Sequence, residues 1–150
     1  MKGKPKISWY AKLLSDERYS VNPSFYAGRY SDEEPIVVDV QLWNNRWGTE
    51  DVENLTDYDI CFFFDRIEDS ILLNYCTIIY NGNIAVPFNV SGHKAILEFS
   101  VKPVILGTKN NGSSADNPGH FVQLRFLFSA TQERLKDNDL KSLYFEVLER

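Results

Sequence analysis

The sequence predicts a single-domain, all-β protein built as an antiparallel β-sandwich, either immunoglobulin-like or jelly-roll, with little helix. Apolar residues alternate with a period of two in several segments, which is typical of half-buried strands. Turn signals separate these segments about every eight to twelve residues. Phe, Trp and Tyr make up 14% of the 150 residues, and aromatic residues favour pleated, half-buried surfaces. This length is enough to bury one core, so the whole chain, 1–150, is expected to form one domain.

The strands are expected in chain order from these patterns. Clear alternation marks 36–43, 58–64, 93–101, 120–128 and 142–149, and shorter candidates lie at 7–14, 24–30 and 103–106. In 36–43 every second residue from Ile36 to Leu42 is apolar, so these side chains point inward and Trp43 points to the opposite face. Several strands are apolar on both faces, which favours two packed sheets. It also favours an interface, because a monomer rarely exposes large apolar patches.

One hairpin and little helix are expected. In 72–88, Asn81-Gly82 separates two apolar segments, and this dipeptide favours a type I′ turn that pairs Tyr80 with Asn83. Residues 65–73 are expected to form one helical turn, and 133–143 have some helical character interrupted by a turn.

Charge and hydropathy exclude several partners. The net charge is −5 and the pI about 5.0, so the chain repels phosphate backbones and nucleic-acid binding is not expected. No apolar run reaches transmembrane length, and none follows the first lysines as in a signal peptide. The N-terminal arm, 1–12, carries Lys2, Lys4, Lys6 and Lys12 without an acid. It is either a tail that binds an acidic surface or a solvated terminus.

The sequence offers few groups for catalysis. His93 and His120 lie at expected turns, and no nucleophile elbow, phosphate loop or HExxH motif is present. The chain is therefore expected not to be an enzyme and to need no cofactor. Cys61 and Cys76 are expected to be free thiols, with a cross-strand disulfide as the lesser alternative.

Two further stretches are polar. Asp57 and Asp59 lie at the start of the strand 58–64 and Asp65 follows its end. The three are weak candidates for calcium ligands, since calcium binds several oxygens in sandwich loops. Their spacing matches no calcium motif, so a charged strand edge that discourages edge pairing is the favoured interpretation and no metal is expected. Residues 107–119 form a long Gly-, Asn- and Ser-rich surface loop, and such loops are usually functional or mobile.

The most distinctive stretch is LWNNRWGTED at 42–51. Trp43, Asn44, Arg46 and Trp47 allow three interpretations. They form a structural corner in which a Trp caps the sandwich with Arg46 stacked on it. They anchor a protein interface, for which Trp and Arg are favoured. Or they form a shelf for a sugar, with rings under the sugar and amides on its hydroxyls. The structural corner is favoured, then the interface, then the sugar.

The segments VVDVQLWNNRWGTEDV, DYDICFFFDRIED and YNGN resemble those of small β-sandwich accessory proteins of tailed-bacteriophage virions, such as capsid decoration and adaptor proteins. The resemblance lies in the overall character of an acidic, aromatic-rich, all-β chain. It implies a non-catalytic structural protein that decorates or cements a capsid, in the virion or in the cytoplasm before assembly. Capsid subunits or copies of the chain itself would be its partners, reached by the arm 1–12 and the loop 107–119. The alternative function is a carbohydrate-binding module that uses the corner around Trp43 and Trp47.

Overall fold

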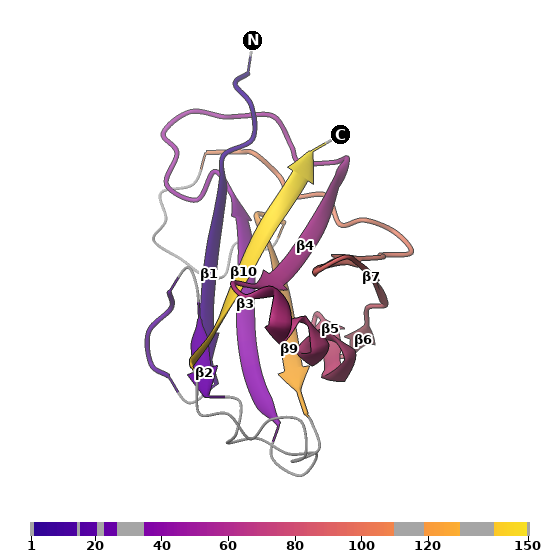
Figure 1. Cartoon of the computed structure of the whole chain (residues 1–150). Coiled ribbons are helices and arrows are strands. Elements are labelled where there is room, and N and C mark those ends of the chain that lie inside the picture. Colours follow the sequence, from indigo (N-terminus) through magenta and orange to yellow (C-terminus); the bar gives the residue numbers. More distant parts are fainter. Residues whose placement is uncertain are drawn as a thin grey trace.

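The computed structural model describes residues 2–14, 16–20, 23–26, 35–109, 119–129 and 140–149. Two five-stranded sheets pack face to face, and the strands of one are inclined to those of the other (Figure 1). Sheet one has the order β1 (Ile7–Leu13), β3 (Ile36–Asn44), β9 (Phe121–Phe128), β5 (Cys76–Tyr80), β6 (Ile84–Ala85). Sheet two has the order β2 (Ser24–Tyr26), β10 (Leu140–Glu149), β4 (Tyr58–Phe64), β8 (Lys94–Leu97), β7 (Phe88–Ser91).

All paired strands are antiparallel, which confirms the predicted sandwich. The chain changes sheet between most consecutive strands. Both termini lie at the same end of the sandwich (Figure 1).

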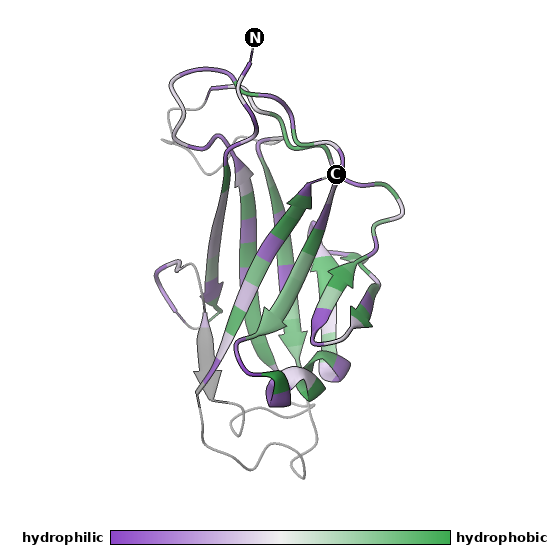
Figure 2. Cartoon of the chain, turned by 45° about the horizontal axis from the view of Figure 1, so that its top comes forward, coloured by the Kyte–Doolittle hydropathy of each residue, from purple (hydrophilic) through white to green (hydrophobic). Residues whose placement is uncertain are grey.

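The core lies between the sheets and follows the predicted alternation (Figure 2). On β3, the inward side chains Val38, Val40 and Leu42 are fully buried. Phe62 on β4 meets Phe126 on β9 edge to face, with ring centroids 4.8 Å apart, and so joins the two sheets. Burying large apolar side chains of this kind supplies most of the stability of a sandwich.

The predicted hairpin is present, with a different register. Asn81 and Gly82 both have positive φ, 52° and 83°, as the Asn-Gly signal predicts. The strand pairs are Tyr80 with Ile84 and Ile79 with Ala85, so the predicted pair of Tyr80 and Asn83 is wrong as a strand pair. Asn83 instead donates its backbone N–H to Tyr80 O at 3.4 Å and closes the turn. The loop therefore holds one residue more than the two-residue prediction.

Helix is limited, in the described residues, to η2 (Ile67–Tyr75), a 3₁₀ helix longer than the single predicted turn. Its Leu72 and Leu73 are buried against the core. Asp69 forms a buried ion pair with Lys141 of β10, with 2.8 Å between Oδ1 and Nζ. This helix is neither long nor apolar enough to cross a membrane.

The remaining expectations hold in part. Strand 93–101 shortens to β8, and its Val101 is 81% exposed instead of facing the core. Segment 103–106 contributes only a bridge between Ile105 and Leu55. Residues 27–30, 110–118 and 130–139, which include most of the polar loop and of the possible helix, lie outside the described residues.

Candidate functional site

Trp43 lies on the outer face of sheet one, as the strand register predicts, yet its side chain is fully buried. Phe121, its neighbour on β9, stacks against it with ring centroids 4.5 Å apart and an interplanar angle of 21°. The indole N–H donates to Gln41 Oε1 at 2.9 Å. Trp43 is therefore packed between its strand neighbours and has no free face for a ligand.

Arg46 covers this tryptophan. Its guanidinium carbon lies 4.3 Å from the ring centroid of Tyr10, 4.6 Å from that of Trp43 and 5.0 Å from that of Trp47. Cations over aromatic faces are attracted by the ring quadrupole, more strongly where water is excluded. Trp47 donates its N–H to Tyr10 Oη at 2.9 Å and remains 61% exposed. We call Tyr10, Trp43, Arg46 and Trp47 the aromatic corner.

Asn44 and Asn45 are buried next to the aromatic corner and bond to backbone. Asn44 Nδ2 donates to Glu53 O at 3.1 Å and to Ile105 O at 3.0 Å, while its Oδ1 accepts from Lys6 N at 2.9 Å. Asn45 Nδ2 donates to the carbonyl oxygens of residues 50 and 107, both at 2.9 Å. The amides predicted as possible sugar ligands thus hold the end of the sandwich together.

Gly48 fits against Asn45, because a Cβ at position 48 would overlap the Asn45 side-chain amide. Asn45 itself has φ 57°, a conformation that asparagine tolerates better than most residues. The turn after β3 is therefore shaped by its own sequence. Of the corner residues predicted as contacts, Trp47 presents the most surface.

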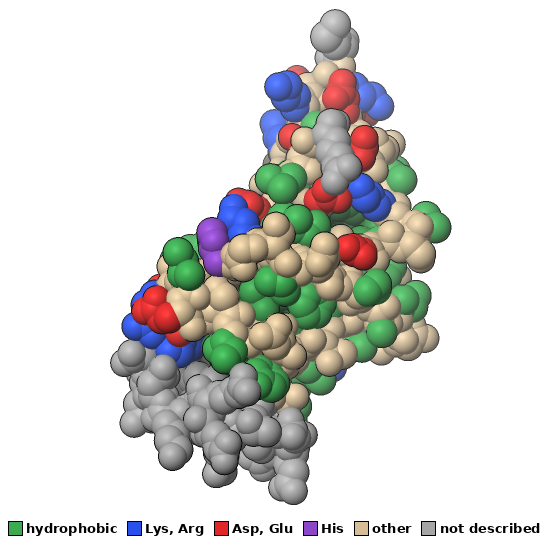
Figure 3. Space-filling view, turned by 45° about the vertical axis from the view of Figure 1, so that its right-hand side comes forward, with side chains coloured by type: hydrophobic (Ala, Val, Ile, Leu, Met, Phe, Trp, Pro, Cys, Tyr) green, Lys and Arg blue, Asp and Glu red, His purple; other side chains and the backbone are tan. Residues whose placement is uncertain are grey.

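The N-terminal arm lies against the same end of the molecule. Gly3 forms a parallel bridge with Val52, and Glu53 N donates to Gly3 O at 2.9 Å. Lys2, Lys4 and Lys6 are exposed. Basic and acidic side chains are intermingled at this end (Figure 3), so the lysines do not form a separate positive tail.

The calcium candidates do not converge. Lys102 Nζ lies 3.7 Å from Asp57 Oδ1 and 3.2 Å from Asp59 Oδ1, so an ammonium group occupies their surroundings. Asp65 follows the opposite end of β4. Within the described residues, no three His, Cys, Asp or Glu side chains gather as metal ligands.

The cysteines and histidines lie apart. Cys61 on sheet two and Cys76 on sheet one are both free, so the alternative of a disulfide is wrong. Burial raises the pKa of both thiols, which keeps them protonated and weakly nucleophilic. His93 meets Phe63 edge to face, and Nδ1 of His120 is buried without a hydrogen-bond partner.

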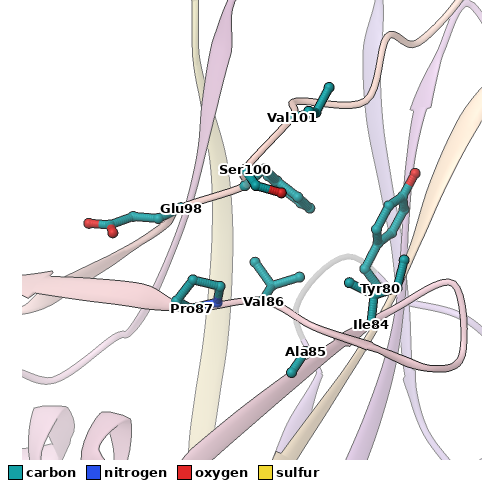
Figure 4. Close-up of a pocket in the computed structure, with 9 residues that line it drawn as sticks. Tyr80, Ile84, Ala85, Val86, Pro87, Glu98, Ser100 and Val101 are labelled. Carbon is teal, nitrogen blue, oxygen red and sulfur yellow. The ribbon is translucent and has the colours of Figure 1, made fainter.

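An apolar groove opens on another side of the molecule, between the edges of the two sheets. Val86 and Pro87 connect β6 to β7. Residues 98–101, which follow β8, pass above them (Figure 4). The hollow between these crossings has a volume of about 580 Å³. Tyr80 closes one side and meets Phe99 edge to face at 5.6 Å.

Apolar side chains form the rim of this groove. Ile84 is 52% exposed and Val101 81%, while Val86 points into the hollow and the Glu98 carboxylate points away from it (Figure 4). Hydrophobic side chains gather in the middle of the side that carries β6 and β7 (Figure 3). This groove was not predicted, because the alternation in 93–101 indicates one continuous strand. Pro87 and Pro103, which cannot donate to a ladder, were the signal that the strands end here.

Comparison with protein-family models, with curated proteins and with solved structures found no match for this chain.

Proposed function

We propose that this chain is a non-catalytic interaction protein that docks onto another structural protein through the apolar groove. The observation that carries the proposal is the pair of exposed side chains, Ile84 and Val101, at the rim of an apolar hollow of about 580 Å³. Exposed apolar surface around a concavity is typical of protein contacts.

The physical basis is burial of apolar surface. Covering a fully exposed Val or Ile side chain contributes about 1.5–3 kcal/mol, and Ile84, which is 52% exposed, contributes less than this. The rim also offers the aromatic edges of Tyr80 and Phe99. A large apolar side chain of the partner would fill the hollow between them. Because the carboxylate of Glu98 points away from the hollow (Figure 4), no charge has to be desolvated inside it.

The setting proposed for this contact is a phage particle, in which the chain decorates or cements the capsid. Only the overall character of the sequence supports that setting, whereas the docking itself is supported by the groove. The partner would then be a capsid subunit, and the exposed lysines of the arm would add a contact that depends on salt.

Co-sedimentation with purified particles tests the proposal. The wild-type chain is expected in the particle fraction in fixed stoichiometry, and the double variant Ile84→Lys/Val101→Lys is expected to be lost from it. Ile67→Lys is the matched control, because Ile67 is 71% exposed on η2, outside the groove. Absence of the wild-type chain from the particles would reject the proposal that the chain belongs to the virion. Equal retention of the double variant would reject the proposal that the groove is the docking site.

The lysines of the arm need a separate test. Deleting residues 1–6 would also remove the backbone bonds of Gly3 and Lys6, so replacing Lys2, Lys4 and Lys6 by Gln is the cleaner change. Attachment of wild type is expected to weaken with added salt more steeply than attachment of this variant. An equal salt dependence of the two proteins would show that the lysines of the arm do not take part in the contact.

The second candidate function is carbohydrate binding at the aromatic corner, and the exposed indole of Trp47 favours it. The buried Trp43, the backbone-bonded Asn44 and the stacked Arg46 leave this indole with few partners for hydroxyl groups. Binding to an oligosaccharide array that disappears in Trp47→Ala would support this candidate. An array without signal would reject it.

A further inference from the structure

A trough crosses the outer face of sheet one, on the side of β3 and β9 turned away from sheet two. Charged and polar side chains lie at its centre with apolar ones, such as Ile79 and Leu127, beside them, and we call it the polar trough. Its volume is about 470 Å³, within the range of small-molecule sites. Strand register fixes its floor, because Lys12 of β1, Asp39 of β3, Arg125 of β9 and Ile79 of β5 are successive cross-strand neighbours. Gln123 stands two residues before Arg125 on the same face.

Asp39 and Arg125 form the fixed centre of the trough. Arg125 Nε lies 2.7 Å from Asp39 Oδ1 and its Nη2 3.1 Å from Oδ2. This two-point contact raises the pKa of Arg125 and holds the guanidinium in one orientation. Each carboxylate oxygen has a second lone pair, and the Arg125 side chain is 48% exposed. The pair therefore offers both acceptors and donors to a ligand.

Tyr19 and Gln123 complete the polar lining. Two backbone hydrogen bonds between Ser20 and Ala11, 2.7 and 2.6 Å long, hold the segment of Tyr19 against β1. Burial raises the pKa of the Tyr19 hydroxyl, Asp39 raises it further, and Arg46 acts in the opposite direction. Tyr19 lines the trough beside Asp39 and Lys12. Gln123 Oε1 accepts from Gln41 Nε2 at 3.1 Å, which orients its amide.

The charged and polar side chains of the trough favour some classes of ligand over others. An apolar ligand would remove water from Lys12, Asp39 and Arg125 and offer these groups no hydrogen bonds in its place. A simple anion would meet the Asp39 carboxylate between the two cations. A ring with neighbouring hydroxyl groups suits the trough, because each hydroxyl can donate to a carboxylate and accept from an ammonium, guanidinium or amide group.

From this arrangement the geometry points to a binding site for a sugar ring in the trough, with Asp39 and Arg125 bonding adjacent hydroxyl groups and Lys12, Tyr19 and Gln123 bonding the others. The site differs from the aromatic corner and does not depend on docking through the apolar groove.

An NMR titration of the labelled protein tests this site. The probes are a panel of free hexoses, N-acetylhexosamines and hexuronic acids, with inorganic phosphate and acetate as separate arms. At least one sugar is expected to cause saturable shifts at the amides of residues 39–41 and 123–125. Asp39→Asn is expected to weaken that binding by about tenfold or more, because a hydrogen bond to a charged group is lost.

Two milder variants keep the test valid if Asp39→Asn does not fold. Lys12→Ala and Tyr19→Phe change partly exposed side chains, and each is expected to weaken the same binding. Lys94→Ala, which removes a charge from the outer face of sheet two, is the control and is expected to bind as wild type does.

Three results would overturn the proposal. The first is no saturable shift with any sugar of the panel. The second is an equal response to phosphate or acetate alone through the same amides, which would mean an anion site. The third is binding that survives the trough variants and is lost in Trp47→Ala, which would place the sugar at the aromatic corner.

Discussion

Asn44 joins three separate chain segments through a single buried side chain. Its amide bonds the backbone of Lys6, Glu53 and Ile105 at 2.9–3.1 Å. Asn44→Ala is expected to lower the free energy of unfolding by about 2–4 kcal/mol, because buried backbone groups lose their partners. Urea denaturation of the purified variant measures this loss.

Trp47→Ala is the contrasting change at the same corner. Trp47 is 61% exposed and forms one exposed hydrogen bond, so its removal is expected to cost less than about 1 kcal/mol. If Trp47→Ala proved the more destabilising of the two, the structural role assigned to the asparagines would be wrong.

Tyr58 links the pH dependence of stability to one buried hydroxyl. Burial raises its pKa well above the ordinary value of 10.0, and the hydroxyl donates to Pro103 O at 2.6 Å. Below pH 10 both the folded and the unfolded state are neutral at this position. Above it the unfolded state ionises first, so the free energy of unfolding is expected to fall as the pH rises.

Tyr58→Phe separates the two contributions of this hydroxyl. At neutral pH the variant is expected to lose about 1 kcal/mol with the hydrogen bond, and above pH 10 its stability is expected to fall less steeply than that of wild type. Urea denaturation at a series of alkaline pH values checks both. Parallel curves for the two proteins would exclude Tyr58 as a source of the alkaline loss.

At the scale of elements, η2 is held to β10 by a buried ion pair. Asp69 and Lys141 have side-chain exposures of 5% and 2%, and Arg66 Nε also lies 3.2 Å from Asp69 Oδ2. Asp69→Asn removes the charge between these two cations and is expected to cost about 3–5 kcal/mol. Chemical denaturation measures it.

Glu68→Gln is the matched control for this element. Glu68 also approaches Arg66, at 3.7 Å, but its side chain is 69% exposed, and exposed ion pairs contribute about 0–1 kcal/mol. Similar losses in the two variants would mean that burial does not set the strength of this contact.

The strands that the sequence predicted best are those with one strictly apolar face. Segments 36–43, 58–64 and 120–128 correspond to β3, β4 and β9 within one or two residues. Their inward side chains are the buried ones, because the period-two pattern and the core impose the same register. The hairpin turn was also predicted, since Asn81 and Gly82 carry the required positive φ.

The elements predicted poorly depend on contacts between distant segments. The predicted strand 93–101 ends at Leu97, because the chain leaves sheet two after this residue. The 3₁₀ helix extends to Tyr75 with its Asp69 paired to Lys141, a residue more than seventy positions away in the sequence. The local sequence therefore predicts neither the end of β8 nor the length of the 3₁₀ helix.

At the scale of the whole molecule, the candidate surfaces combine residues from several elements. Trp43, Arg46 and Trp47 of the aromatic corner were predicted together because they lie close in the sequence, whereas Tyr10 of β1 was not predicted. The burial of Trp43 and Asn44 agrees with the favoured structural interpretation of this stretch. The apolar groove and the polar trough were not predicted, since each arises only where strands of different sequence position come together. Only the strand order and register show which side chains line each of them.

We infer that the apolar groove is the docking face of this chain. Hydrogen exchange of the chain, free and bound to particles, tests it most directly because it reports protection along the whole backbone. Binding is expected to slow exchange at residues 84–86 and 98–101 and to leave residues 44–48 unchanged. Protection confined to residues 44–48, or no protection in a particle-bound sample, would contradict it.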